Sequence, residues 1–394
     1  MLKGKTVVLG VTGSIAAYKI ANLARMLVKQ HCEVHVLMTQ NATNFINPIT
    51  FETLTKHKCL INTFDRNFEF SVEHVALAKA ADVVMIAPAS ANVIGKIANG
   101  IADDMLTTTV MACPCKKIVS PAMNHNMFHN PIVQDNIEKL KHYGYEIVEP
   151  AHGMLANGDM GDGRMPDEEL LFEYIVKEIA FEKDMTGKKV LVTAGATVEA
   201  IDPVRFITNH SSGKMGFALA KNAMLRGADV TLVMGKCDSE PPVFVNTVKV
   251  QSAKDMYDAV IERADSMDII VKAAAVADYR PKNVSSEKVK KQDGNMSIEL
   301  ERTDDILKTL GERKNGQFIC GFSMETENML ENSRKKLEKK NCDMIVANNL
   351  KQDGAGFGGN TNIVTIITKD DEVQLEKMTK DEVAEKIFDF ILSR

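Results

Sequence analysis

The stretch DVVMIAPASANVIGKIANGIADDMLTTT, residues 82–109, decides how the first half of the chain folds. Residues 82–87 are apolar and rich in β-branched side chains, which is typical of a buried strand in a parallel sheet. We expect Pro88 to end this strand, and the small residues after it to let a ligand approach the backbone. Ser90 and Asn92 then offer a hydroxyl and an amide where a helix should begin. Taken alone, the stretch is equally consistent with an ordinary strand-to-helix turn capped by Ser90.

Strands and helices alternate on both sides of this stretch. Residues 6–12 predict a strand that turns into a helix, residues 33–38 a second strand with a polar end, and residues 117–120 a further strand. This alternation predicts a doubly wound parallel sheet. Only Gly10 and Gly13 precede the first helix, so the turn lacks the three-glycine dinucleotide fingerprint and favours a mononucleotide phosphate.

The end of this first half is rich in glycine. Residues 150–166 contain little apolar surface and predict a long loop of the kind that closes over a site. A helix at 167–182 should complete a first domain, residues 1–184. A short polar linker should then lead into a second domain, residues 187–394.

The second half repeats the pattern of the first. Residues 188–197 run from basic to apolar residues and end in threonine and glycine, and helices should separate further strands at 229–234, 268–275, 317–322, 343–347 and 363–367. We therefore predict an α/β fold with two doubly wound, Rossmann-like domains. Residues 210–216 lack the first glycine and the hydroxyl residue of a P-loop, so they do not predict a Walker ATPase.

Composition limits the class of protein. A chain of 394 residues is long enough for two domains, and its formal net charge of -5 argues against binding to nucleic acid or a membrane surface. No apolar run reaches the roughly 18 residues that a membrane span needs. The N-terminal residues lack the features of a signal peptide, and the seven cysteines lack disulfide-framework spacing, so we expect reduced thiols and a cytoplasmic location. No pattern identifies a metal site.

Several motifs resemble known enzyme families. The first half contains three such motifs, at residues 13–15, 88–92 and 121–127, and an isolated His74. Together they resemble FMN-binding flavoprotein cysteine decarboxylases. Those in the second half resemble phosphopantothenate-cysteine ligases, and they are residues 202–205, 208–216 and 274–280. Joined in this order, the halves resemble the bacterial bifunctional family of coenzyme A biosynthesis, and the resemblance covers essentially the whole chain.

The first resemblance implies a flavodoxin-like domain that decarboxylates phosphopantothenoylcysteine to 4'-phosphopantetheine. Oxidation by FMN at the thiol-bearing carbon would create the electron sink that loss of carbon dioxide needs. His74 would act as an acid-base or positioning group, although a lone histidine opening a helix is usually only a surface residue, and Asn124 would hold the departing carboxylate. The implied FMN contacts are Gly13, Ser14, Ile15, Thr39, Ser90, Ala91, Asn92, Val93 and Ala122.

One residue departs from the family pattern. Family members carry a catalytic cysteine in an Ala-Cys-Gly sequence of the glycine-rich loop, and Asn157 stands in its place. The family cysteine protonates the enethiolate before its reduction, and a carboxamide is no substitute for a thiol acid. The alternatives are a complete decarboxylase that compensates for Asn157 and an FMN-binding regulatory or scaffold module fused to an active ligase. His74 and Asn124 favour the enzyme, because a binding module needs neither.

The second resemblance implies that CTP activates the carboxylate of 4'-phosphopantothenate as an acyl-CMP, from which the amine of cysteine displaces CMP. Mg²⁺ is expected on the phosphates. Arg205 and Asn209 would lie at the acyl phosphate, and Lys288 near the nucleotide and the reacting carboxyl. Lys282, Lys288, Lys290 and Lys291 form a basic cluster, although such runs are more often solvated surface. The implied nucleotide contacts are Ala275, Asp278, Lys288, Asp305, Ile306, Phe322, Lys336 and Lys340.

The resemblance also implies how the chain assembles. Flavoprotein relatives place FMN between the subunits of trimers, and ligase relatives pair as dimers, so we expect a homo-oligomer for which a dodecamer is one arrangement. Its partners would be the small molecules 4'-phosphopantothenate, cysteine and CTP. Residues 303–306 depart from the family sequence Asn-Pro-Asp-Ile, but Asp305 and Ile306 are retained.

Overall fold

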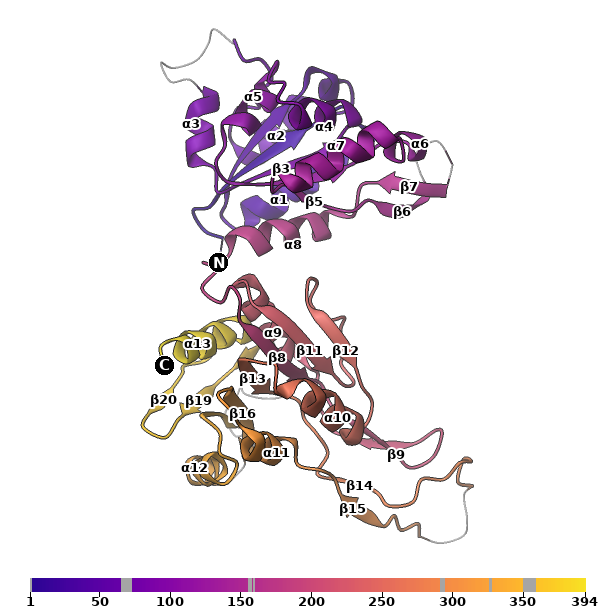
Figure 1. Cartoon of the computed structure of the whole chain (residues 1–394), viewed down its shortest axis with the longest axis vertical. Coiled ribbons are helices and arrows are strands. Elements are labelled where there is room, and N and C mark those ends of the chain that lie inside the picture. The colour runs from indigo at the N-terminus through magenta and orange to yellow at the C-terminus, as the bar shows by residue number, and fades with distance from the viewer. Residues whose placement is uncertain are drawn as a thin grey trace. The chain divides into compact units, whose positions relative to one another are not determined.

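A parallel sheet of five strands organises the first unit of the chain, Met1–Phe181 (Figure 1). The computed structural model describes residues 2–64, 73–154, 158, 160–290, 295–325, 328–349 and 359–394. The sheet has the order β2-β1-β3-β4-β5, in which every pair is parallel, so its ligand crevice should lie at the carboxyl ends of β1 and β3. The strands are β1 Thr6–Val11, β2 Glu33–Met38, β3 Val83–Ala89, β4 Lys116–Pro121 and β5 Glu146–Ile147.

Helices cover both faces of this sheet because each has an apolar stripe. In α1, Lys19–Lys29, the buried residues Ile20, Leu23, Ala24 and Leu27 recur every three or four positions. The core on one side joins β3 to α4 and α5 through residues such as Ile86, Ile94 and Leu106. The other helices are η1 Ile15–Tyr18, η2 Gln40–Asn44, α2 Pro48–Thr55, α3 Glu73–Ala80, α4 Ala91–Ala98, α5 Met105–Ala112, α6 His125–Phe128, α7 Pro131–His142 and α8 Glu168–Ile179.

Pro88 does not end its strand, which corrects the expectation from sequence. β3 continues through Pro88 to Ala89. The register between β3 and β4 shifts between Ile86 and Ala89, and pairing resumes where Ala89 meets Pro121. The ladder therefore passes over the proline, which has no N–H to donate.

The glycine-rich segment 150–166 is not a simple loop, which corrects a second expectation. Its described residues include β6 Ala151–Met154 and β7 Met160–Arg164, which pair antiparallel as a hairpin. Asn157, which lies between these strands in the sequence, is outside the described residues.

An eight-stranded sheet organises the second unit, Glu182–Arg394 (Figure 1). Its order is β12-β11-β8-β13-β16-β17-β19-β20, and the pairs are parallel up to β17, whereas β19 and β20 join antiparallel. The α/β prediction is confirmed for both units, although this sheet is mixed at one edge. Its strands are β8 Lys189–Ala194, β11 Asp229–Met234, β12 Asn246–Lys249, β13 Ile269–Lys272, β16 Phe318–Glu325, β17 Met344–Asn349, β19 Val364–Ile367 and β20 Glu372–Gln374.

Among the described residues of the second unit, five helices and three strand pairs accompany the sheet. Helix α9 packs on α13 and on β8, where Gly216 permits a close approach because a Cβ there would lie 2.5 Å from the Cβ of Ala194. The helices are α9 Lys214–Leu225, α10 Ala253–Ala264, α11 Ile306–Arg313, α12 Met329–Lys339 and α13 Lys380–Leu392. The paired strands are β9 Val198–Ala200 with β10 Phe206–Thr208, β14 Tyr279–Pro281 with β15 Leu300–Arg302, and β18 Thr361–Asn362 with β21 Met378–Thr379.

Residues 182–187, expected as a linker, pack on the second unit. Met185 is fully buried, and Lys183 Nζ donates to the carbonyl of Leu225 at 2.7 Å. The buried Arg226 side chain pairs with Asp184 at 3.2 Å and also with Asp389 of α13. The segment is therefore part of this unit. No helix among the described residues is long and apolar enough to cross a membrane.

Candidate active sites

Thr12 joins two strand ends in the first unit. Its buried hydroxyl donates to the carbonyl of Pro88 at 2.6 Å and accepts from the backbone N–H of Ser90 at 2.9 Å. These two bonds tie the residue after β1 to the end of β3 and to the start of the turn into α4, where the sequence predicts a ligand. Sequence reasoning did not single out Thr12, and its only signal was a hydroxyl residue closing an apolar strand.

Three predicted hydroxyl residues cap the helices that follow β1, β2 and β3. Ser14 accepts from the N–H of Ala16 at 3.4 Å, Thr39 from that of Ala42 at 3.3 Å, and Ser90 from that of Val93 at 3.5 Å. Because the strand order is β2-β1-β3, these caps lie on neighbouring strands at the same edge of the sheet. The structure thus brings residues 13–15, Thr39 and residues 90–93 to one edge.

A cavity of about 520 Å³ lies at the turn that follows β4, between η1 and the β6–β7 hairpin. Of the predicted flavin and catalytic residues, Ser14, Ile15, Ala122 and Asn124 line it. Thr39, residues 90–93 and the half-buried His74 of α3 are described but do not line this cavity. The full lining is Ser14, Ile15, Ala16, Tyr18, Lys19, Ala122, Met123, Asn124, Met154, Gly163, Arg164 and Met165.

Asn124 has a fixed orientation at this cavity. Its Oδ1 accepts from the N–H of Asn126 at 2.9 Å as the N-cap of α6, so the amide NH₂ is the end available to an anionic group. The hairpin is held against the same turn because the N–H of Met123 donates to the carbonyl of Gly163 at 3.1 Å. Gly163 has a φ of 115°, and a Cβ would lie 2.3 Å from the carbonyl oxygen of Met123, so only glycine fits.

Much of the cavity lining is apolar and open to solvent. Ile15, Tyr18 and Met154 are 58%, 62% and 69% exposed. Exposed apolar side chains beside a polar, capped strand edge suit a planar aromatic ring with a polar or anionic tail. A second molecule that covered these side chains would also bury apolar surface.

A second cavity, of about 700 Å³, lies in the second unit beside the ends of β13 and α11. Five predicted nucleotide contacts line it: Asp278, Asp305, Ile306, Lys336 and Lys340. Ala275, Phe322 and Lys288 are described but do not line it, although the carbonyl of Phe322 accepts from Lys336 Nζ at 3.0 Å. The structure therefore brings most of the predicted nucleotide contacts together.

Acidic and basic side chains both line this cavity. Asp305 caps α11 by accepting from the N–H of Lys308 at 2.9 Å, and it forms an ion pair with Lys340. Burial raises the pKa of Asp305, but the hydrogen bonds from Lys340 and from the N–H of Lys308, together with the charges of Lys340 and Lys272, outweigh it, so that the pKa lies below its usual value. The positive end of α11 and the lysines make the cavity suitable for phosphate groups.

Sequence reasoning missed Lys272, the last residue of β13, which lines the same cavity. Burial lowers the pKa of Lys272 to about 8, and the positive charge of Lys336 acts in the same direction. A lysine that ends an apolar run, Ile269–Lys272, was the signal that could have identified it. Such a half-buried, readily titrated cation would gain from an anionic ligand.

Arg205 and Asn209 are held by contacts within the unit. Arg205 donates to Asp202 through Nε at 3.0 Å and Nη2 at 2.6 Å, and Nη2 also donates to the carbonyl of Val289 at 2.5 Å. Asp202 in turn accepts from the N–H of Val289 at 3.1 Å. Burial raises the pKa of Asp202, but these bonds hold it well below its usual range. Asn209 Nδ2 donates to the carbonyl of Ala275 at 3.2 Å.

Lys288 directly precedes the clamped Val289 and is exposed. Of its basic neighbours, Lys282 pairs with Glu299 at 2.7 Å on the surface, and Lys291 lies outside the described residues. The Asp202–Arg205 pair therefore fixes the backbone that carries Lys288, while the lysine side chain itself faces solvent within this chain.

Comparison with known proteins agrees with this architecture. A family model described as Flavoprotein matches residues 1–180, and one described as DNA/pantothenate metabolism flavoprotein C-terminal domain matches residues 185–394. The coenzyme A biosynthesis bifunctional protein CoaBC of Bacillus subtilis (strain 168) is 48% identical over 373 residues, which are 94% of this chain and 92% of that protein. The protein of the same name from Borreliella burgdorferi is 41% identical over 390 residues, covering 98% and 99%. A crystal structure of the C-terminal domain of a CoaBC protein matches with a TM-score of 0.47 at 48% identity, covering 54% of this chain and 97% of that chain.

Fold and sites together define a flavoprotein unit followed by a DNA/pantothenate metabolism unit in one chain. The chain belongs to the family of bifunctional coenzyme A biosynthesis proteins. The resemblance drawn from its motifs is thereby confirmed.

Proposed function

We propose that the chain joins 4'-phosphopantothenate to cysteine at the expense of CTP, and that its first unit then decarboxylates the product with FMN. The charged cavity of the second unit is the observation that carries the ligase assignment. The capped strand edge and the position of Asn124 support the decarboxylase assignment. Family membership supports both activities and their place in coenzyme A biosynthesis.

The second cavity has the positively charged groups that bind a nucleoside triphosphate. Lys272, Lys336 and Lys340 surround it, and α11 directs its N-terminus at it. Lysines and a helix N-terminus are standard partners of phosphate. We place CTP here, with Mg²⁺ on its phosphates, and Asp278 and Ile306 as further contacts. The choice of CTP among nucleotides follows from the family resemblance.

The reacting carboxyl group would lie toward Ala275, Asn209 and Lys288. Asn209 is anchored on the carbonyl of Ala275, and Arg205 anchors the backbone next to Lys288. We therefore propose that Lys288 and Asn209 stabilise the negative charge of the acyl phosphate, and that Arg205 contributes from its clamp with Asp202. A carboxylate has no leaving group until it is activated as an acyl phosphate. The main task of these three residues would therefore be to stabilise the negative charge at this phosphate.

Residues 182–394 on their own should form phosphopantothenoylcysteine from phosphopantothenate, cysteine and CTP. The second unit contains every proposed ligase residue, and residues 182–187 pack on it. Lys288→Gln should lower the rate on the order of 10²-fold, as expected for loss of one charge-stabilising donor. The matched control is Lys282→Gln, which removes another exposed lysine of the same segment. Undiminished turnover by Lys288→Gln would show that this lysine is only solvated surface.

The first unit fits FMN at its capped strand edge. Residues 13–15, Thr39, residues 90–93 and Ala122 would hold the phosphate, ribityl chain and ring, and the ring would cover Ile15. When bound, FMN supplies a reversible two-electron oxidation. The amide of Asn124 would hold the substrate carboxylate. His74 does not line the cavity with Asn124. We therefore propose that the chain forms a homo-oligomer in the cytoplasm and that His74 of another subunit completes the site. The trimers expected from the family resemblance would allow this.

The purified full chain should be yellow and hold about one FMN per chain. Ile15→Glu should weaken FMN binding about tenfold or more, because it places a carboxylate beside the ring and the phosphate. Ile132→Glu is the control, since Ile132 is 71% exposed on α7 and does not line the cavity. Flavin absorbance after gel filtration measures both. A full chain that stays colourless after incubation with FMN would contradict the proposal.

An FMN-binding scaffold fused to a working ligase is the alternative function. Release of carbon dioxide from phosphopantothenoylcysteine separates the two, because a scaffold releases none. The presence of both His74 and a fixed Asn124 favours the enzyme.

A further inference from the structure

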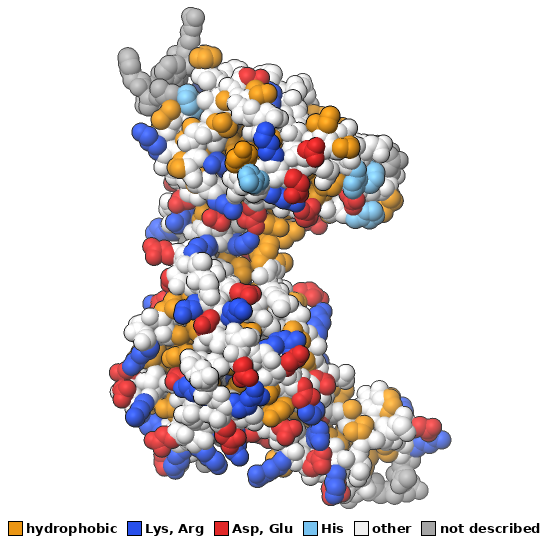
Figure 2. Space-filling view, in the orientation of Figure 1, with side chains coloured by type: hydrophobic (Ala, Val, Ile, Leu, Met, Phe, Trp, Pro, Cys, Tyr) orange, Lys and Arg blue, Asp and Glu red, His pale blue; other side chains and the backbone are white. Residues whose placement is uncertain are grey.

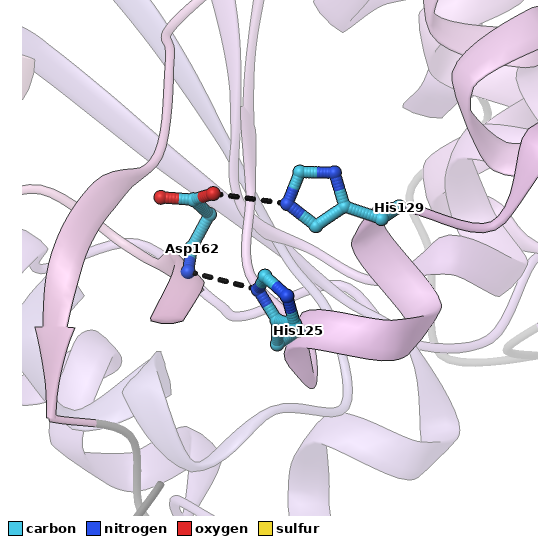
Figure 3. A group of neighbouring side chains, drawn as sticks. All are labelled: His125, His129 and Asp162. Carbon is cyan, nitrogen blue, oxygen red and sulfur yellow. Dashed lines mark hydrogen bonds and ion pairs between the residues drawn. The ribbon is translucent and has the colours of Figure 1, made fainter. Parts of the chain in front are cut away.

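Three histidines surround one aspartate on the surface of the first unit, apart from the residues used above. His125 opens α6 and His129 caps its end, so they lie one helical turn apart, with ring centroids 4.4 Å apart. Asp162 of β7, in the neighbouring hairpin, directs its carboxylate toward His129 and its backbone nitrogen toward His125 (Figure 3). Figure 2 shows histidine side chains gathered at one end of this unit.

The atoms of this cluster converge. Asp162 Oδ2 lies 2.9 Å from His129 Nε2, and the N–H of Asp162 donates to His125 Nδ1 at 3.1 Å. His152 of β6 reaches the other carboxylate oxygen, with Nδ1 at 2.9 Å from Oδ1. One ligand atom from each of His125, His129 and Asp162 lies within 4.8 Å of the other two.

The local sequence permits this approach. A Cβ on Gly161 would lie 2.7 Å from His125 Nδ1, so glycine at this position makes room for the imidazole ring. Gly163 likewise packs on the carbonyl of Met123, at the turn that leads into α6. Two glycines therefore let β7 lie close against the helix and bring Asp162 between its histidines.

We propose that His125, His129 and Asp162 bind one divalent transition-metal ion such as Zn²⁺, with His152 holding the carboxylate from its other side. Two imidazoles and a carboxylate form a ligand set that suits Zn²⁺, Ni²⁺ or Cu²⁺ and disfavours Mg²⁺. The site is therefore distinct from the Mg²⁺ expected at the nucleotide. A fourth position remains open to water, as in zinc sites with three protein ligands.

Small side-chain movements complete the geometry. Tetrahedral zinc, with bonds of about 2.0 to 2.1 Å, keeps its ligand atoms about 3.3 Å apart. The 2.9 Å contact between Asp162 and His129 must open slightly, and His125 must approach. At His125 Nδ1 the ion would replace the N–H of Asp162 as partner. The i, i+4 spacing of the histidines on one helical turn already directs both rings to the same side.

Binding would cross-link α6 to β7. The N-cap of α6 is Asn124, and β7 contains Gly163, and both residues line the first cavity. The ion would therefore hold the β6–β7 hairpin on the turn that carries Asn124. The metal ion would fix the position of this wall of the cavity without contacting the molecule bound in the cavity.

Titration of the chelator-treated full chain with Zn²⁺, followed by calorimetry, tests the site. We expect one ion per chain, and affinity lowered at least tenfold by His129→Gln and by Asp162→Asn. His152→Ala should lower it about 10- to 100-fold, as loss of a partner that orients a ligand does. His142→Gln, on α7 and outside the cluster, is the control. Far-ultraviolet circular dichroism checks that each variant folds.

Co²⁺ provides a second measurement, because the chain also has seven cysteines. Bound Co²⁺ should show tetrahedral ligand-field bands without a thiolate charge-transfer band, and the bands should disappear in His129→Gln. Zn²⁺ should also slow proteolysis of the β6–β7 hairpin in the unaltered chain but not in the His129→Gln or Asp162→Asn variants. A thiolate band, equal Zn²⁺ affinity in the Asp162→Asn variant, or no binding by the unaltered chain would each overturn the proposal.

Discussion

The full chain, supplied with phosphopantothenoylcysteine and FMN, should release carbon dioxide without completing the reduction to 4'-phosphopantetheine. On the proposed roles, oxidation and loss of carbon dioxide need the supplied flavin together with His74 and Asn124, both of which this chain has. The final step needs an acid that protonates the enethiolate, and Asn157 stands where the family has a cysteine. A carboxamide does not give up a proton at neutral pH. The expected product is the oxidised aminoenethiol.

Asn157→Cys should restore the complete reaction and raise the yield of 4'-phosphopantetheine at least about 100-fold, the contribution of a general acid. Mass spectrometry of single-turnover products measures this, since the two species differ by two hydrogens. Asn157→Ser is the matched control, because a hydroxyl of similar size is also too weak an acid. If the unaltered chain makes the reduced product catalytically, another group supplies the proton and the role assigned to position 157 is wrong.

Affinity for CTP should fall as the pH rises through about 8. Burial and the charge of Lys336 lower the pKa of Lys272 to about 8, so Lys272 is a cation below this pH and neutral above it. A triphosphate in the cavity is attracted only to the cation. Lys272→Met should weaken CTP binding on the order of tenfold to 100-fold at pH 7 and flatten this pH dependence. Calorimetric titration of the full chain across this pH range measures both effects.

Titration of Lys272 should have the opposite effect on stability: without nucleotide, the free energy of unfolding should rise with pH, whereas CTP affinity should fall. In the unfolded chain Lys272 keeps its proton up to its ordinary pKa, so between about 8 and that value the unfolded state holds more protons and the free energy of unfolding rises with pH. Lys272→Met should therefore stabilise the free protein at pH 7 while it weakens CTP binding. Lys282→Met, which removes a surface cation outside the cavity, should change neither. If the Lys272→Met variant binds CTP as tightly as the unaltered chain, Lys272 does not contact the nucleotide.

The sequence predicted the features that depend on periodicity and on polar residues at strand ends. Apolar runs such as residues 82–87 located the strands. The family resemblance, rather than periodicity, named Asp305 and Lys340 as nucleotide contacts, and the structure places both at the second cavity. Features that depend on tertiary pairing were missed. The antiparallel addition of β19 follows from neighbouring strands rather than from its own residues, and the β6–β7 hairpin is hidden by its glycines.

Two polar residues, the buried Thr12 and the half-buried Lys272, were missed for a related reason. Thr12 and Lys272 end apolar strands and read as ordinary strand termini, because their roles come from strands distant in the sequence. Pro88 shows the converse. A proline usually ends a strand, but here the register of two long, buried strands shifts around it and outweighs the local preference.

The contacts of Arg226 have a consequence for how this chain can be built. The same guanidinium pairs with Asp184 at the start of the second unit and with Asp389 in its last helix. The two ends of that unit are therefore neighbours in space. Units with adjacent ends tolerate circular permutation and can be fused at either end. We therefore expect the second unit to fold equally well when the order of the two units along the polypeptide is reversed.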